Sequence, residues 1–159
     1  MNFFMQVTWV VLVALVSGYG FAEDSHLRGE CSPWMSTFYG KPIKERIAAF
    51  DSYSIDDQYQ IFICGNQMLH PPAIYLARPF AGRGESAVPL LKEKLIQAGD
   101  DLTIRDIVRV FVEMKRLSTY DASKDAFLAA LISRKVAGMH DSGWRGIAQK
   151  NVNEILGEK

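Results

Sequence analysis

The stretch that decides the fold is AVPLLKEKLIQAGDDLTIRDIVRVFVEM, residues 87–114. Apolar residues recur every three or four positions on both sides of a short polar break at residues 98–101. This spacing predicts two amphipathic helices, the second opening near Thr103. Because neither helix can bury its apolar face alone, we expect both to pack against further helices.

The same spacing recurs along the chain and predicts seven helices between residues 41 and 157. The other stripes are Ile43, Ile47 and Phe50; Ile55, Tyr59, Phe62, Ile63 and Met68; Ile74, Ala77, Phe80 and Ala81; Phe127, Leu128, Leu131 and Ile132; and Trp144, Ile147, Ala148, Val152 and Ile155. Pro79 lies inside the third helix and predicts a kink there. Residues 59–64, YQIFIC, could form a strand, but one strand alone has no partner. The sequence therefore predicts an all-α fold.

Residues 1–22 resemble a secretory signal. They contain no charged side chain, and residues 7–16 are almost wholly apolar. Gly20 and Ala22 supply small residues at the −3 and −1 positions of a cleavage site after Ala22. A retained membrane anchor and a cytosolic protein are the alternatives, although the apolar run is short for a span. We expect a signal peptide at 1–22, a loop-like N-terminal cap segment at 23–40 and a helical domain at 41–159, in a periplasmic or secreted protein.

The charge balance excludes one class of partner. The chain has 18 basic and 18 acidic residues, interspersed and without like-charge blocks. A neutral chain has no electrostatic footprint for a phosphate backbone, so we expect no nucleic acid partner. After signal cleavage we also expect no membrane association.

Cys31 and Cys64 are the only cysteines. In an exported protein such a pair predicts one disulfide, which ties the segment 23–40 to the helices. Two separate buried thiols are the alternative. Near Cys31 lie Trp34, Phe38 and Tyr39, which form either an exposed binding patch or, as we favour, the lid of a small core.

Two turns of the chain repeat each other. Asp101-Leu-Thr-Ile-Arg105 and Asp141-Ser-Gly-Trp-Arg145 share the pattern Asp-x-x-apolar-Arg, and the apolar register continues through Ile107 with Ile147 and Val112 with Val152. A period near 40 residues is typical of two-helix repeats that stack on one another.

RGESAVPLLKEKL, residues 83–95, followed by DDLTIR, residues 100–105, resembles the second helix, the turn and the next helix start of HEAT repeats. The resemblance covers residues 72–156 and is weaker over 41–70. It implies a short right-handed α-solenoid of about three helix pairs. In that family turn aspartates and arginines form ladders, which implies that Asp101, Arg105, Asp141 and Arg145 act as inter-repeat struts. The whole chain is also similar to a group of small exported bacterial proteins with no assigned activity.

No catalytic motif occurs, and we expect no catalytic, cofactor-binding or metal-binding residue. His26, His70 and His140 lack ligand spacing. Gly82-Arg83-Gly84 is better explained as a helix end than as a phosphate loop. We therefore predict that Arg83 matters less to stability than Arg105.

These observations favour an exported helical module that binds a protein partner of unknown identity. One version of this hypothesis is a periplasmic immunity protein that neutralises a secreted toxin. The alternative from another class is an enzyme with an unrecognised site, assembled from scattered residues such as His70, Asp101 and His140.

Overall fold

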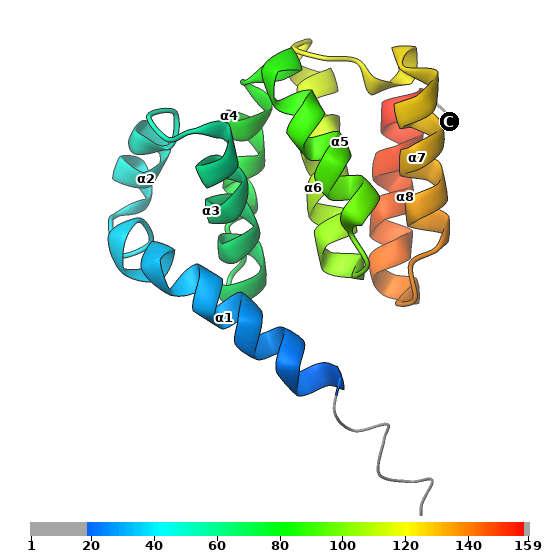
Figure 1. The fold of residues 1–159 in the computed structure, drawn as a ribbon. Helices are drawn as coiled ribbons and strands as arrows, with labels where there is room; N and C mark the ends of the chain where they lie inside the picture. The colour runs from blue at the N-terminus through cyan, green and yellow to red at the C-terminus, as the bar shows by residue number, and fades with distance from the viewer. Residues whose placement is uncertain (1–18, 158–159) are drawn as a thin grey trace, which may run out of the picture.

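The computed structural model describes residues 19–157, so most of the predicted signal peptide lies outside the described residues. This part of the chain is helical and contains no β-strand (Figure 1). The all-α prediction is confirmed, with eight α-helices in place of seven. They are α1 (Tyr19–Thr37), α2 (Ile43–Phe50), α3 (Ile55–Met68), α4 (Ala77–Ala81), α5 (Val88–Gln97), α6 (Asp101–Leu117), α7 (Ala126–Ala137) and α8 (Ser142–Leu156).

Helix α6 is the centre of the molecule. It packs between α4 and α8. In Figure 1, α5 lies in front of α6 and α7 lies in front of α8. Its predicted stripe, from Ile104 to Met114, is buried as expected. Helix α3 also contacts α6, so three elements far apart in sequence meet along one helix.

Aspartates and a serine decide where several helices begin. The side chains of Ser54, Asp100, Asp125 and Asp141 accept hydrogen bonds from backbone N–H groups in the first turns of α3, α6, α7 and α8. Such caps satisfy donors that have no partner inside the helix. The predicted breaks between helices are therefore built by these residues.

The helix predicted around Pro79 differs from expectation. In place of one kinked helix, a 3-10 turn at Ile74–Leu76 leads into the short α4, which ends at Gly82. Proline has no backbone N–H, so it cannot complete the bond that a longer α-helix would make to Tyr75. The competing strand at residues 59–64 is absent, because this stretch lies within α3 and most of it is buried.

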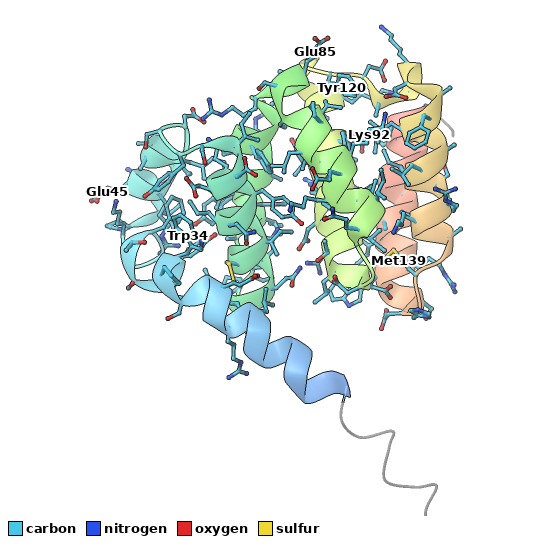
Figure 2. The ribbon with its side chains drawn as sticks, in the orientation of Figure 1. Trp34, Glu45, Glu85, Lys92, Tyr120 and Met139 are labelled. Carbon is cyan, nitrogen blue, oxygen red and sulfur yellow. A yellow bond between two sulfur atoms is a disulfide. The ribbon has the colours of Figure 1, made fainter. Side chains whose placement is uncertain are left out.

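The loop-like character predicted for residues 23–40 is wrong. Most of this segment belongs to α1, which begins at Tyr19 and continues past Pro33. Helix α1 packs against α3, and a disulfide joins Cys31 to Cys64 with an S–S distance of 2.04 Å (Figure 2). The predicted bridge is thus confirmed, and its attachment to α3 holds α1 on the body.

The aromatic group after Cys31 closes a small core, as favoured. Phe38 and Tyr39 are buried, and Trp34 meets the ring of Tyr53 edge-on at 5.8 Å (Figure 2). The Tyr39 hydroxyl donates to the carbonyl of Ile61 at 2.6 Å. It lies so close to Gly65 that any side chain there would collide with it, which explains a glycine inside α3.

Arg83 makes more hydrogen bonds than its predicted place at a helix end would require. Its Nε donates to Oε1 of Gln58 at 3.0 Å, and its Nη2 donates to the carbonyls of Asp51 and Tyr53 at 2.6 and 3.0 Å. Arg83 therefore clamps the turn between α2 and α3 onto the end of α4.

Several members of the predicted apolar stripes are exposed. Ile43, Ile47, Ile74, Phe127, Trp144 and Ile147 all keep a large part of their surface in solvent. Three of them, Ile74, Trp144 and Ile147, gather at one place beside α6. None of the helices within residues 19–157 is both long and apolar enough to cross a membrane.

Candidate binding groove

A groove of about 280 Å³ lies where α3, α6 and α8 approach one another. We call it the α6 groove. It is lined by Asn66 of α3, by Pro72 and Ile74 after that helix, by Arg105, Asp106 and Arg109 of α6, and by Trp144, Ile147 and Asn151 of α8. It draws on residues from three separate parts of the sequence, so only the folded chain contains it.

The rim of the α6 groove is apolar. Ile74 is 58 % exposed, and Trp144 and Ile147 are partly exposed beside it. The guanidinium of Arg105 lies 4.4 Å from the centre of a Trp144 ring, a cation–π contact that holds the indole at the groove edge. An exposed apolar cluster around a concavity is typical of a surface that contacts another molecule.

Beneath this rim lie polar groups with unmet hydrogen-bonding capacity. Asn66 is only 5 % exposed, yet neither its Nδ2 nor its Oδ1 finds a partner among the described residues. Oδ2 of Asp106 and Nε of Arg109 are likewise without one. Buried polar atoms are normally paired, so four unpaired atoms along one groove mark it as unusual.

The buried amide of Gln58, unlike that of Asn66, is hydrogen-bonded at both ends. Its Nε2 donates to the carbonyl of Phe50 at 2.7 Å and its Oε1 accepts from Arg83. Both ends of this amide are used within the fold, whereas both ends of the Asn66 amide are unused. The two amides lie on the same helix, α3, so the difference comes from their surroundings in the groove.

Asp106 is the electrostatic centre of the α6 groove. Arg105 donates through Nε and Nη2 to Oδ1 of Asp106, at 2.8 and 2.6 Å. Burial nevertheless raises the pKa of Asp106 to about 6, because the loss of water outweighs the lowering by Arg105 and by nearby Gln67. The charge of Asp100 raises this pKa further.

An arginine cluster adjoins the groove through Arg109. Buried Glu113 accepts a hydrogen bond from Nη1 of Arg116 at 2.8 Å. It also forms ion pairs with Nη2 of Arg109 at 2.8 Å and with Nη1 of Arg78 at 3.8 Å. Arg116 also binds both carboxylate oxygens of Glu154, at 2.6 and 2.8 Å. The polar side of the groove thus continues as an alternation of arginines and glutamates along α4, α6 and α8.

The four predicted struts are placed differently from the proposed ladder. Arg105 pairs with its neighbour Asp106, not with an aspartate of another turn. Asp101 does bridge two turns, because its carboxylate accepts the backbone N–H groups of His140 and Asp141 at 3.1 and 2.6 Å. Asp141 caps α8, and Arg145 donates to the carbonyl of Met139 at 3.2 Å. The aspartates therefore reach backbone where we expected guanidinium groups.

The residues considered for an enzyme do not form a common site in the described structure. His70 and His140 are exposed, and none of His70, Asp101 and His140 lines the α6 groove. Within residues 19–157, no three His, Cys, Asp or Glu side chains are grouped so that they could hold a metal ion.

A second, larger hollow of about 580 Å³ lies beside the loop that contains Tyr120, close to Glu85 (Figure 2). Several of its polar groups are engaged within the fold. Lys115 donates to the carbonyl of Ile155, Thr119 donates to that of Ala81, and Asp121 accepts from Ser123. None of the buried polar atoms that lack a hydrogen-bond partner among the described residues lies in this hollow, which distinguishes it from the α6 groove.

Sequence reasoning missed Asn66, Arg109 and Asn151, and assigned Trp144 and Ile147 to the core. One signal was available. In the 40-residue register Asn151 takes the place of Phe111, which is fully buried, so a polar side chain stands where the repeat calls for a core residue.

Comparison with protein-family models, with curated proteins and with solved structures finds no match for this chain.

Proposed function

We propose that this chain is an exported protein-binding module whose α6 groove holds an extended segment of a partner protein. The observation that carries the proposal is the unpaired amide of Asn66 under an exposed apolar rim. An unpaired buried polar group costs about 1–3 kcal/mol. A partner that supplies the missing hydrogen bonds recovers this free energy on binding.

An extended peptide has the complementary chemistry. In a strand the N–H and the C=O of one residue point to the same side, which allows both to bond one neighbouring group. The Asn66 side chain offers one acceptor and donor hydrogens on the same amide. Peptide recognition commonly combines such backbone bonds with pockets for side chains. Here the pocket is formed by Ile74, Trp144 and Ile147.

The size of the groove favours a segment over a compact ligand. A volume of about 280 Å³ lies just below the range of about 300–1,000 Å³ that is typical of small-molecule pockets. It suits one or two side chains of a longer chain. The unpaired atoms are almost wholly inaccessible to water, so binding requires the exposed rim side chains to change rotamer, as interface side chains commonly do.

The proposed architecture is a short right-handed α-solenoid of HEAT-like pairs. Hydrogen bonds between residues 37–40 positions apart support it, because they join equivalent places in successive helix pairs. They link Lys115 to Ile155, Arg116 to Glu154, Thr119 to Ala81, Lys135 to Ile96 and Ala98, and Asp101 to His140 and Asp141. Stacked pairs commonly present extended binding surfaces. The Cys31–Cys64 bridge supports export, since disulfides persist in oxidising compartments.

The test uses Asn66→Leu, which removes the amide while keeping similar volume. Immobilised protein captures partners from the periplasmic and secreted fractions of the source cells, and mass spectrometry identifies them. We expect a specific partner on the wild-type protein that is lost on Asn66→Leu. Gln60→Leu is the matched control, because Gln60 lies on the same helix but does not line the groove.

Thermal melts of the same variants separate binding from folding. Since neither end of the Asn66 amide is bonded within the fold, Asn66→Leu should melt at the wild-type temperature or above it. A clear loss of stability, or a partner captured equally by Asn66→Leu, would show that the amide serves the fold and that the groove is not the binding site.

A further inference from the structure

Around the α6 groove, two acidic side chains are buried and the arginines beside them are more exposed. The carboxylates of Asp106 and Glu113 are buried, and Glu113 keeps only 6 % of its side-chain surface exposed. The arginine side chains that neutralise Glu113 are more exposed, at 66 % for Arg78, 36 % for Arg109 and 40 % for Arg116. An approaching molecule therefore meets arginines before it meets their counter-ions.

Two of these arginines have capacity to spare. Arg78 approaches Glu113 only to 3.8 Å, and Nε of Arg109 has no partner among the described residues. Both carboxylate oxygens of Glu154 are bound by Arg116, and no ion pair joins Glu154 to Arg78 or Arg109 among the described residues. Arg109 lines the groove itself, which places this positive charge at one end of the apolar rim.

We infer that the groove recognises an acidic peptide segment, in which a large apolar side chain enters beside Ile74, Trp144 and Ile147 and a nearby carboxylate binds Arg109 and Arg78. This inference rests on the proposed function and adds the chemistry of the ligand. The carboxylate could belong to an Asp or Glu side chain or to the end of a chain, since a guanidinium fork binds either in the same way.

A basic segment fits the same surface poorly. Asp106 already receives both donors of Arg105 on one oxygen and is almost wholly buried. A cation would have to pass the exposed arginines to reach the one oxygen that remains. Like charges brought together at an interface disfavour the wrong partner.

The experiment selects a displayed library of random twelve-residue peptides against the purified protein. Synthetic copies of the enriched peptides are then titrated against the wild type, Asn66→Leu and Arg78→Gln. Each peptide is made with a free and with an amidated C-terminus. Lys150→Gln is the control for loss of a positive charge, because Lys150 is exposed on α8 and does not line the groove.

We expect enriched peptides to pair a large apolar residue with a carboxylate close to it in sequence. Arg78→Gln should weaken their binding about 3–10-fold, as expected for a partly exposed ion pair, and added salt should reduce this difference. Lys150→Gln should bind as the wild type does. If only the free C-terminus supports binding, the carboxylate is that of a chain end.

Three results would overturn the inference, and they differ in what else they affect. Enriched peptides that are neutral or basic, and that still require Asn66, would leave the groove as a peptide site and remove only its acidic preference. Failure to enrich any peptide on the wild type would remove the proposed function as well. Tighter binding of single-stranded oligothymidylate, with the same dependence on Arg78, would assign the arginines to a nucleic acid.

Discussion

Asp101 and Asp141 are joined although 40 residues separate them, because the Asp101 carboxylate accepts the backbone N–H of Asp141 at 2.6 Å. It also accepts the N–H of His140 at 3.1 Å. The start of α6 thereby fixes the start of α8, and the two helices lie in contact along their length. A single side chain thus fixes the start of α8 relative to the start of α6.

Asp101→Ala should destabilise the protein by about 1–3 kcal/mol, because two backbone donors lose a charged acceptor. Urea unfolding measures the change. Asp56→Ala is the matched control, since Asp56 lies in the first turn of α3 and is exposed, and it should lose less than about 1 kcal/mol through the helix dipole alone. Equal losses in the two variants would remove the bridging role of Asp101.

Arg83→Ala should destabilise the protein at least as much as Arg105→Ala does. This reverses the order that the sequence predicts, because Arg83 donates to three acceptors around the α2–α3 turn. We expect a loss of about 2–4 kcal/mol for Arg83→Ala and of about 1–3 kcal/mol for Arg105→Ala. Urea melts decide the order, with Arg134→Ala, an exposed position on α7, as the near-neutral control.

Stability should depend on pH through Asp106. Its pKa is about 6 in the folded chain, against an ordinary value of 3.8 for an aspartate. The native state therefore holds a proton that the unfolded state releases, and this contribution to stability is lost as pH rises through about 6. Between pH 4.5 and 7.5 the loss should reach about 2 kcal/mol. The groups that act on Asp106 are Arg105, Gln67 and Asp100.

The measurement compares the wild type with Asp106→Asn across that range. Taking the difference matters, because the pKa values of Asp121, Asp125 and Glu154 are lowered and these groups change stability in the opposite direction at low pH. Relative to the wild type, Asp106→Asn should gain stability as pH rises. A difference that stays constant from pH 4.5 to 7.5 would contradict the raised pKa.

Reduction of the Cys31–Cys64 bridge should lower stability by about 3–4 kcal/mol, the loss expected when a closed loop of 33 residues is opened. Thermal melts with and without dithiothreitol measure it. Titration of unfolded, unreduced protein should find no free thiol. Two reactive thiols in protein purified from the exported fraction would contradict both the bridge and the compartment.

The helices could be predicted from the sequence because period-3.6 stripes and capping residues are local features. The stripe from Ile104 to Met114 and the cap at Asp100 need no knowledge of distant residues. Helix α1 escaped prediction because its apolar residues do not form one stripe, and because Pro33 and Gly29 suggest a loop. Its position depends on Cys64, which lies 33 residues away.

The α6 groove could not be predicted, because exposure is not a local property. Trp144 and Ile147 follow the same helical spacing as the buried Ala148 and Ile155. They remain exposed because no further element covers that face of α8 within the described residues. The unused amide of Asn66 is also invisible in a sequence, where it resembles the fully bonded amide of Gln58.

The spacing of the long-range hydrogen bonds has a consequence for how the molecule opens. Most of those linking α4 through α8 connect residues 33–40 positions apart, so each helix is bonded mainly to the helices next to it in the fold. When most bonds join neighbouring helices, a terminal helix can detach while the rest stays folded. The α6 groove takes Asn66 from one end and Trp144 from the other. A ligand bound there would contact both α3 and α8, which are linked to each other mainly through α6. Amide exchange should therefore slow throughout α8 when the ligand binds.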